Sequence, residues 1–245
     1  MSRSLSGHAP VGPWLSTAVL SRAPALGGAA AAATLAASAW AALDPSRAGL
    51  SLLLAAVALL VAGAAWLDAG QGSAKEVTLV AALGGVAAAS RVLFAFVPGV
   101  QPVTVIVLAT GAALGPRAGM GVGAVAALVS NFFLGQGIWT PWQMLGWAAC
   151  GAAGGALRHV VVRRYAFAAV AFALGVVFSG LMDVWQWFSF YPHTLGSFTV
   201  QLSRGLPFVL AHAIGNVIFA LAIGPELRRL LDRHGRRLRT EVVWQ

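Results

Sequence analysis

Asn131-Phe-Phe-Leu-Gly-Gln-Gly-Ile-Trp-Thr-Pro-Trp-Gln143 joins two apolar segments of the chain, Ala118–Phe133 and Pro141–Leu157. In a water-soluble protein, Gly-Gln-Gly and Thr-Pro would simply indicate turns. Here the flanking segments are apolar enough to lie in hydrocarbon, and the loop between them carries amides and tryptophans. We therefore interpret the loop as a structured cap over something bound within a membrane.

The composition of the chain predicts an all-α, polytopic membrane helical bundle. The chain has 245 residues, of which 59% are hydrophobic and 9% charged, whereas soluble domains carry about 25% charged residues. Several windows reach the roughly 20 apolar residues that a membrane-spanning helix needs. The net charge of +9 comes from arginines at segment ends, which points to topology rather than to nucleic acid. The single cysteine, Cys150, excludes an internal disulfide.

The apolar segments divide the chain into four parts. A short tail, 1–23, precedes an N-terminal transmembrane hairpin at 24–70. A signal peptide is the competing interpretation of the first apolar segment, Ala25–Leu43, and we favour a retained hairpin because a second segment follows at once. A polar linker then leads to a membrane core at 77–224, and a basic amphipathic tail occupies 225–245.

The core contains six apolar segments, so that two further helices precede a six-helix unit. The six are Val77–Phe96, Val103–Leu114, Ala118–Phe133, Pro141–Leu157, Tyr165–Phe188 and Leu206–Gly224. Cytoplasmic loops collect Lys and Arg. Eight crossings with the N-terminus inside would place thirteen of the 16 basic residues on the inner side, leaving Arg47, Arg91 and Arg204 elsewhere. We therefore expect a multi-pass plasma-membrane protein with both termini cytoplasmic.

Polar side chains within the core segments converge on the outer half of the membrane. At 1.5 Å per residue, Arg91 lies about 22 Å beyond the inner end of its segment, Asn131 about 21 Å and Asp183 about 28 Å. His212 lies about 12 Å in from the outer end of its segment, with Asn216 one turn deeper. A charge in the bilayer centre costs at least roughly 2.5–3.5 kcal/mol, so these groups need partners, water or a ligand. We predict a pocket that opens to the outside.

Each of these residues also has a structural interpretation. Arg91 and Asp183 could pair with each other, contact a ligand, or do both. His212 and Asn216 share a helix face at i,i+4 spacing and could equally form interhelical hydrogen bonds. These alternatives stay open at the level of sequence.

The tryptophans fall into two groups. Trp139 and Trp142 are set among amide side chains, which suits a flat, partly polar ligand. Trp185 and Trp187 could instead belong to an interfacial aromatic belt. The predicted ligand-contacting residues are Arg91, Gln101, Asn131, Gln136, Trp139, Trp142, Gln143, Asp183, Trp185, Trp187, His212 and Asn216.

Catalytic and metal-binding motifs are absent from the sequence. It contains no metal-ligand cluster, nucleophile elbow, paired carboxylates or phosphate-binding glycine loop, so we predict no catalytic residue, metal or cofactor. Any ATP-driven step would need another chain. Ala81, Gly85 and Ala89 form a small-residue stripe that serves either internal packing or docking onto another membrane protein. The basic tail suits anionic lipid rather than nucleic acid.

Five stretches of the core are similar to a known family. They are Arg91-Val-Leu-Phe-Ala-Phe-Val-Pro-Gly-Val-Gln-Pro-Val-Thr104, Gly115-Pro-Arg-Ala-Gly119, Ser130-Asn-Phe-Phe-Leu-Gly-Gln-Gly-Ile-Trp-Thr-Pro-Trp-Gln143, Ser179-Gly-Leu-Met-Asp183 and Ala213-Ile-Gly-Asn216. With them, the core resembles the substrate-binding (S) components of energy-coupling factor (ECF) vitamin transporters. The central loop is most similar to members associated with cobalamin uptake.

The resemblance implies a fold, a function and partners. S components are six-helix proteins that capture a vitamin near the outer surface, without chemistry on it. A shared transmembrane subunit and two ATPase subunits bind the S component, which is thought to topple in the membrane. An alanine-spaced motif on the family's first helix mediates that docking; Ala81, Gly85 and Ala89 match its spacing, with glycine replacing one alanine. The N-terminal hairpin and the arginine-rich tail depart from the family pattern.

Two other function classes compete with vitamin capture. An intramembrane enzyme could use Asp183 and His212 as acid and base, although no nucleophile or metal site accompanies them. A self-contained secondary transporter would usually show internal repeats or paired broken helices, and none is visible in the sequence.

Overall fold

The computed structural model describes residues 74–240 and five isolated helical positions, 29, 32, 33, 36 and 40; side chains are described as far as Gly235. The predicted tail at 1–23 lies outside the described residues. So does the predicted hairpin at 24–70, apart from those five positions.

Residues 74–240 form six α-helices and contain no strand. The helices are α4 (Ala74–Leu93), α5 (Val103–Leu114), α6 (Pro116–Leu134), α7 (Thr140–Ala156), α8 (Arg164–Phe190) and α9 (Leu195–Thr240). Four of them, α4, α6, α8 and α9, are long and apolar enough to cross a membrane. The prediction of an all-α membrane helical bundle is therefore confirmed, and each predicted core segment corresponds to one helix.

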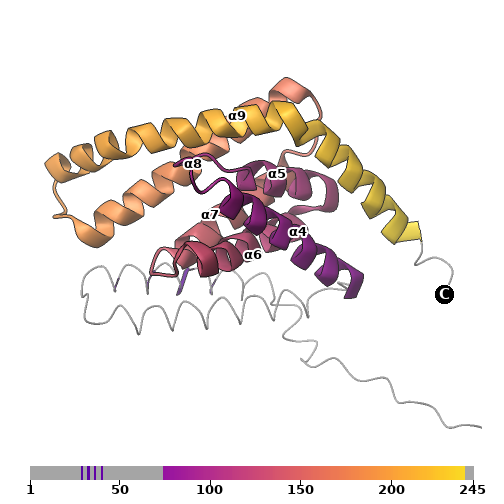
Figure 1. The fold of residues 1–245 in the computed structure, drawn as a ribbon, viewed down its shortest axis with the longest axis horizontal. Coiled ribbons are helices and arrows are strands. Elements are labelled where there is room, and N and C mark those ends of the chain that lie inside the picture. Colours follow the sequence, from indigo (N-terminus) through magenta and orange to yellow (C-terminus); the bar gives the residue numbers. More distant parts are fainter. Residues whose placement is uncertain (1–28, 30–31, 34–35, 37–39, 41–73, 241–245) are drawn as a thin grey trace, which may run out of the picture.

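The short helix α5 lies at the centre of the bundle. It contacts α4, α6, α7, α8 and α9, and every residue from Val103 to Ala113 is buried. A helix that is apolar on all sides is one that neighbouring helices must surround. In Figure 1, α8 and α9 run side by side along one side of α5, while α4 and α6 lie on the other.

Glycines let α5, α6 and α7 approach at backbone distance. A Cβ atom on Gly111 of α5 would overlap the carbonyl oxygen of Gly151 of α7, and one on Gly151 would overlap the backbone of Gly119 in α6. Small residues permit such approach between membrane helices. The glycine-rich stretch at 151–155 therefore packs closely against α5 and α6.

The last helix differs from its prediction. The apolar segment Leu206–Gly224 predicts a helix followed by a separate tail, whereas α9 is continuous from Leu195 to Thr240 and contains two prolines. Figure 1 shows α9 changing direction toward its C-terminal end, and Pro225, which cannot donate a backbone hydrogen bond, accounts for the bend. Leu231 beyond it is buried against the core.

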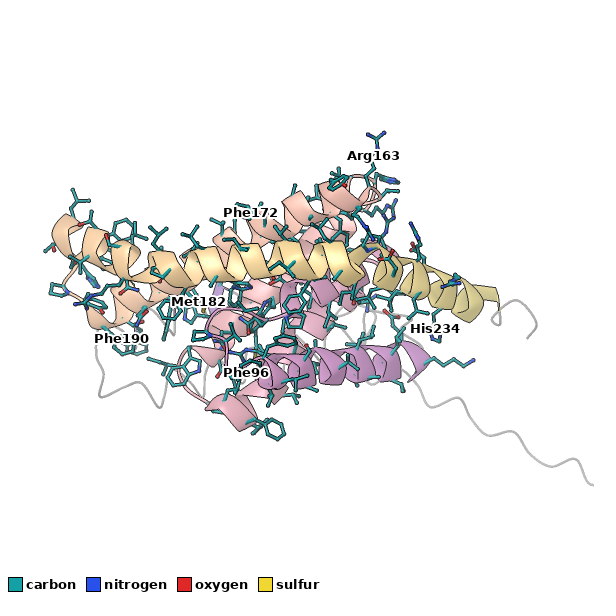
Figure 2. The ribbon with its side chains drawn as sticks, turned by 45° about the horizontal axis from the view of Figure 1, so that its top comes forward. Phe96, Arg163, Phe172, Met182, Phe190 and His234 are labelled. Carbon is teal, nitrogen blue, oxygen red and sulfur yellow. The ribbon has the colours of Figure 1, made fainter. Side chains whose placement is uncertain are left out.

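The two ends of the bundle differ in character. Figure 2 shows Arg163 and His234 toward one end of the molecule and Phe190 toward the opposite end. The end that holds Arg163 and His234 is the basic end that the sequence predicts to be cytoplasmic. Arg91 lies in the last turn of α4, whereas Lys75 lies at the opposite end of that helix.

Candidate functional site

Arg91 is the centre of the most extensive polar network among the described residues. Its Nε donates to Gln101 Oε1 at 2.9 Å. Its Nη1 donates to Ser130 Oγ at 2.7 Å and to Asn131 Oδ1 at 2.6 Å. The guanidinium carbon lies 4.9 Å from the ring centroid of Trp147, within the range of a cation–π contact. Residues from α4, α6, α7 and the α4–α5 connection therefore hold one guanidinium.

The turn between α4 and α5 brings Gln101 to Arg91. Gly99 has φ of 79°, a left-handed conformation that glycine adopts without steric cost. A Cβ there would also lie 3.1 Å from the carbonyl oxygen of Phe208. The connection can therefore turn sharply against α9 before α5 begins.

Asn131 links Arg91 to the cap loop. The side chain of Asn131 is 1% exposed, and its Nδ2 donates to Thr140 Oγ1 at 2.9 Å and to Gln143 Oε1 at 2.8 Å. Thr140 donates in turn to Gln136 Oε1 at 2.9 Å. The loop between α6 and α7 is thus ordered by side-chain hydrogen bonds, as its polar composition predicts.

A second branch leads from Trp147 into the bundle. Its indole Nε1 donates to Thr104 Oγ1 at 3.2 Å, and Thr104 Oγ1 is 3.1 Å from His212 Nε2. The other ring nitrogen of His212 is 3.1 Å from Ser179 Oγ. Trp147 also stacks on Phe178, with ring centroids 4.3 Å apart. We call the connected residues the Arg91 network: Arg91, Gln101, Thr104, Ser130, Asn131, Gln136, Thr140, Gln143, Trp147, Ser179 and His212.

Sequence reasoning missed five members of this network as site residues. They are Thr104, Ser130, Thr140, Trp147 and Ser179. Four of them carry hydroxyls that lie in apolar segments or in the cap loop, which is where interhelical hydrogen bonds are expected. Trp147 follows Gln143 by four residues, so helical periodicity places both on one face of α7.

The side chain of Asp183 makes no described hydrogen bond to the Arg91 network. It accepts a hydrogen bond from Gln201 Nε2 at 3.2 Å, and it packs so closely on Gly205 that a Cβ atom there would overlap the carboxylate. The same amide of Gln201 donates to Gln186 Oε1 at 3.0 Å. Both Asp183 and Arg91 are described, and no ion pair joins them. Asp183 belongs to the contact between α8 and α9.

None of the four predicted tryptophan side chains makes a described hydrogen bond to the Arg91 network. Trp139, 36% exposed, donates from Nε1 to the carbonyl oxygen of Gly135 at 3.3 Å and lies in the cap loop. Trp142 and Trp185 have buried Nε1 atoms without a hydrogen-bond partner. Trp187 donates to the hydroxyl of Ser197 at the start of α9, so it links the end of α8 to the start of α9.

Asn216 makes an interhelical hydrogen bond through its Nδ2, while its buried Oδ1 has no described partner. It is fully buried, and its Nδ2 lies 3.3 Å from the carbonyl oxygen of Ala171 in α8. This is an interhelical hydrogen bond one turn below His212, and no described bond connects Asn216 with the Arg91 network.

The small-residue stripe of α4 faces outward from the described core. Ala81 and Ala89 are exposed, and a Cβ atom on Gly85 would have no heavy atom within 4 Å. The adjacent Gly84 is buried and points inward, where a Cβ would lie 2.5 Å from Val125 Cγ1 of α6. This geometry argues against the interpretation that the stripe packs against the other described helices.

Comparison with known protein families gives a match. Residues 71–227 match a family described as a family of unknown function, DUF6580. The chain belongs to the DUF6580 family. The matched region includes the whole Arg91 network. Neither the search of curated proteins nor the search of solved structures found a match.

The chemistry that this DUF6580 site can perform follows from its groups. It offers one guanidinium, several amides and hydroxyls, and an indole face. No cluster of three His, Cys, Asp or Glu residues that could hold a metal occurs in the described part of the chain. Such groups can bind and orient a small polar molecule.

Proposed function

We propose that this chain is the substrate-binding (S) component of an ECF-type importer, which captures a vitamin from outside and delivers it inward with a shared transmembrane subunit and two ATPase subunits. The Arg91 network carries the proposal. It gathers a charged side chain and several amides within an apolar bundle, at the end of α4 that the arginine distribution predicts to face outward. Cobalamin is the specific vitamin that the cap-loop resemblance favours.

A purely structural role explains such a network poorly. Membrane helices associate through small residues and van der Waals packing, and the glycine contacts between α5, α6 and α7 already supply both. Keeping a charge inside a membrane bundle costs several kcal/mol. Residues that carry this cost are by default candidates for ligand contact.

The outward stripe on α4 supports docking to a partner. Ala81, Gly85 and Ala89 expose a smooth strip on which another membrane helix could approach closely. Gly85→Leu should block assembly with the transmembrane subunit while leaving the chain folded, because the new side chain meets open space. Gly84→Leu is the matched comparison and should unfold the chain, because it collides with Val125.

Binding to the purified protein tests the proposal. Tryptophan fluorescence is titrated with candidate vitamins, including cobalamin, and the vitamin is then recovered and analysed. Stoichiometric quenching with an unchanged vitamin supports capture. Chemical turnover would instead favour the enzyme that uses Asp183 and His212, and uptake into vesicles by this chain alone would favour a self-contained transporter.

Gln101→Ala and Asn131→Ala should weaken vitamin binding, because each removes a direct partner of Arg91. Asn216→Ala is the control, since its one described hydrogen bond lies in the α8–α9 contact. Equal binding by all three variants would contradict the assignment of the site to the Arg91 network.

A further inference from the structure

The positive charge of Arg91 has no negative counterpart among the described residues. Its three described hydrogen bonds go to an amide oxygen of Gln101, a hydroxyl of Ser130 and an amide oxygen of Asn131, all neutral. Asp183, the buried carboxylate of the bundle, is bonded to Gln201 instead. The site therefore holds a cation that is hydrogen-bonded to neutral groups and is not paired with a described anion.

Two other features of the site offset only part of this charge. Arg91 lies in the last turn of α4, where the helix dipole contributes about half a negative charge. The face of Trp147 adds the weaker attraction of an aromatic quadrupole. A complete negative charge at the guanidinium would still be favoured, since a buried charge is stable when it is paired.

One edge of the guanidinium is open. An arginine has five N–H donors, and the three on Nε and Nη1 are used within the network. Neither N–H of Nη2 donates to a described residue. Nη2 is not one of the fully buried side-chain atoms that lack a hydrogen-bond partner among the described residues, whereas Trp142 Nε1 is. Nη2 is therefore not fully enclosed by protein, and its orientation is fixed by the bonds of the other two nitrogens.

We propose that the small molecule bound at the Arg91 network carries an anionic group, a carboxylate or a phosphate, that pairs with Nη2 of Arg91. This inference rests on the proposed function of ligand capture. The fixed guanidinium would select an acid over its neutral amide, alcohol or ester. Because truncating one partner of a buried charge pair costs at least about 2 kcal/mol, the neutral analogue should bind at least about 30-fold more weakly.

The test uses the full chain in lipid nanodiscs and matched pairs of probes. The carboxylate arm compares nicotinate with nicotinamide, pantothenate with panthenol, and biotin with its methyl ester. The phosphate arm compares pyridoxal phosphate with pyridoxal. Each probe is titrated against the wild type, Arg91→Gln and Arg204→Gln. Arg204 is the control because it is an exposed arginine of α9 outside the network. Thermal unfolding and size-exclusion chromatography verify that each variant is folded.

The expected result is that one acid binds the wild type and Arg204→Gln at least about 30-fold more tightly than its neutral partner, and that Arg91→Gln loses this preference. A neutral probe that binds as tightly as its acid, or an unchanged preference in Arg91→Gln, overturns the inference and leaves ligand capture standing. If no probe binds, mass spectrometry of the molecule extracted from the purified protein decides: an acid supports the inference and a neutral molecule overturns it. Recovering no molecule at all overturns ligand capture as well.

Discussion

Replacing Asn131 by leucine should destabilise the bundle far more than the same replacement of Asn216. Both asparagines are almost completely buried in apolar helices. Asn131 accepts a charge-assisted bond from Arg91 and donates to Thr140 and Gln143, whereas Asn216 makes one long bond to a backbone carbonyl. The two positions therefore share burial and differ in hydrogen bonding.

The expected magnitude follows from the bonds that each variant loses. A hydrogen bond to a charged group contributes about 1.5–3 kcal/mol, and a neutral interhelical bond in a membrane protein about 0.6 kcal/mol. Asn131→Leu should thus lower the free energy of unfolding by about 3–4 kcal/mol. Asn216→Leu should lower the free energy of unfolding by about 1 kcal/mol or less. The single hydrogen bond that it loses is long, with 3.3 Å between Asn216 Nδ2 and the Ala171 carbonyl oxygen.

Equilibrium unfolding in mixed micelles by increasing sodium dodecyl sulfate, followed by tryptophan fluorescence, measures both free energies. A difference of about 2–3 kcal/mol between the two variants supports the network as an energetic unit. Equal losses, or a larger loss for Asn216→Leu, would refute the reasoning. Such a result would mean that Arg91 is held by its other contacts and that Asn131 contributes packing alone.

Three further predictions concern the packing of the bundle. Gly151→Leu should prevent folding, because a side chain there overlaps the α6 backbone. Gly180→Leu should be tolerated, because a Cβ there meets no heavy atom within 4 Å. Expression and monodispersity in detergent distinguish the two variants. Trp147→Phe keeps the ring stack but loses the indole hydrogen bond, so unfolding free energy should fall by about 1 kcal/mol. Leu231→Ala should lower that free energy by about 2–3 kcal/mol, whereas the exposed Leu230 should tolerate alanine.

Several features of the fold follow from local sequence. The hydrophobic run Val103–Leu114 gives the bounds of α5 directly, because Pro102 precedes it and Gly115 ends it. The cap loop is equally readable, since its glycines, proline and amides interrupt two apolar segments. Hydropathy and turn chemistry are properties of neighbouring residues, so a single chain displays them without any knowledge of its tertiary contacts.

The partners of the polar side chains could not be read in this way. The sequence brings Arg91 and Asp183 to similar depths and leaves pairing open, yet Asp183 bonds to Gln201. Depth along a helix follows from counting residues. Which face meets which neighbour depends on how each helix is rotated and how closely it packs, and that is set by contacts such as Gly205 against Asp183.

The sequence by itself determined that this chain is a helical membrane protein, because the apolar content and segment lengths leave no soluble alternative. It also identified Arg91 and Asn131 as polar residues of apolar segments that require partners, water or a ligand. Only the tertiary structure joined them to Thr104, Trp147 and His212, which belong to other segments of the chain. Hydrogen bonding acts over about 3 Å, so it depends on the packed arrangement of helices and not on their order in the sequence.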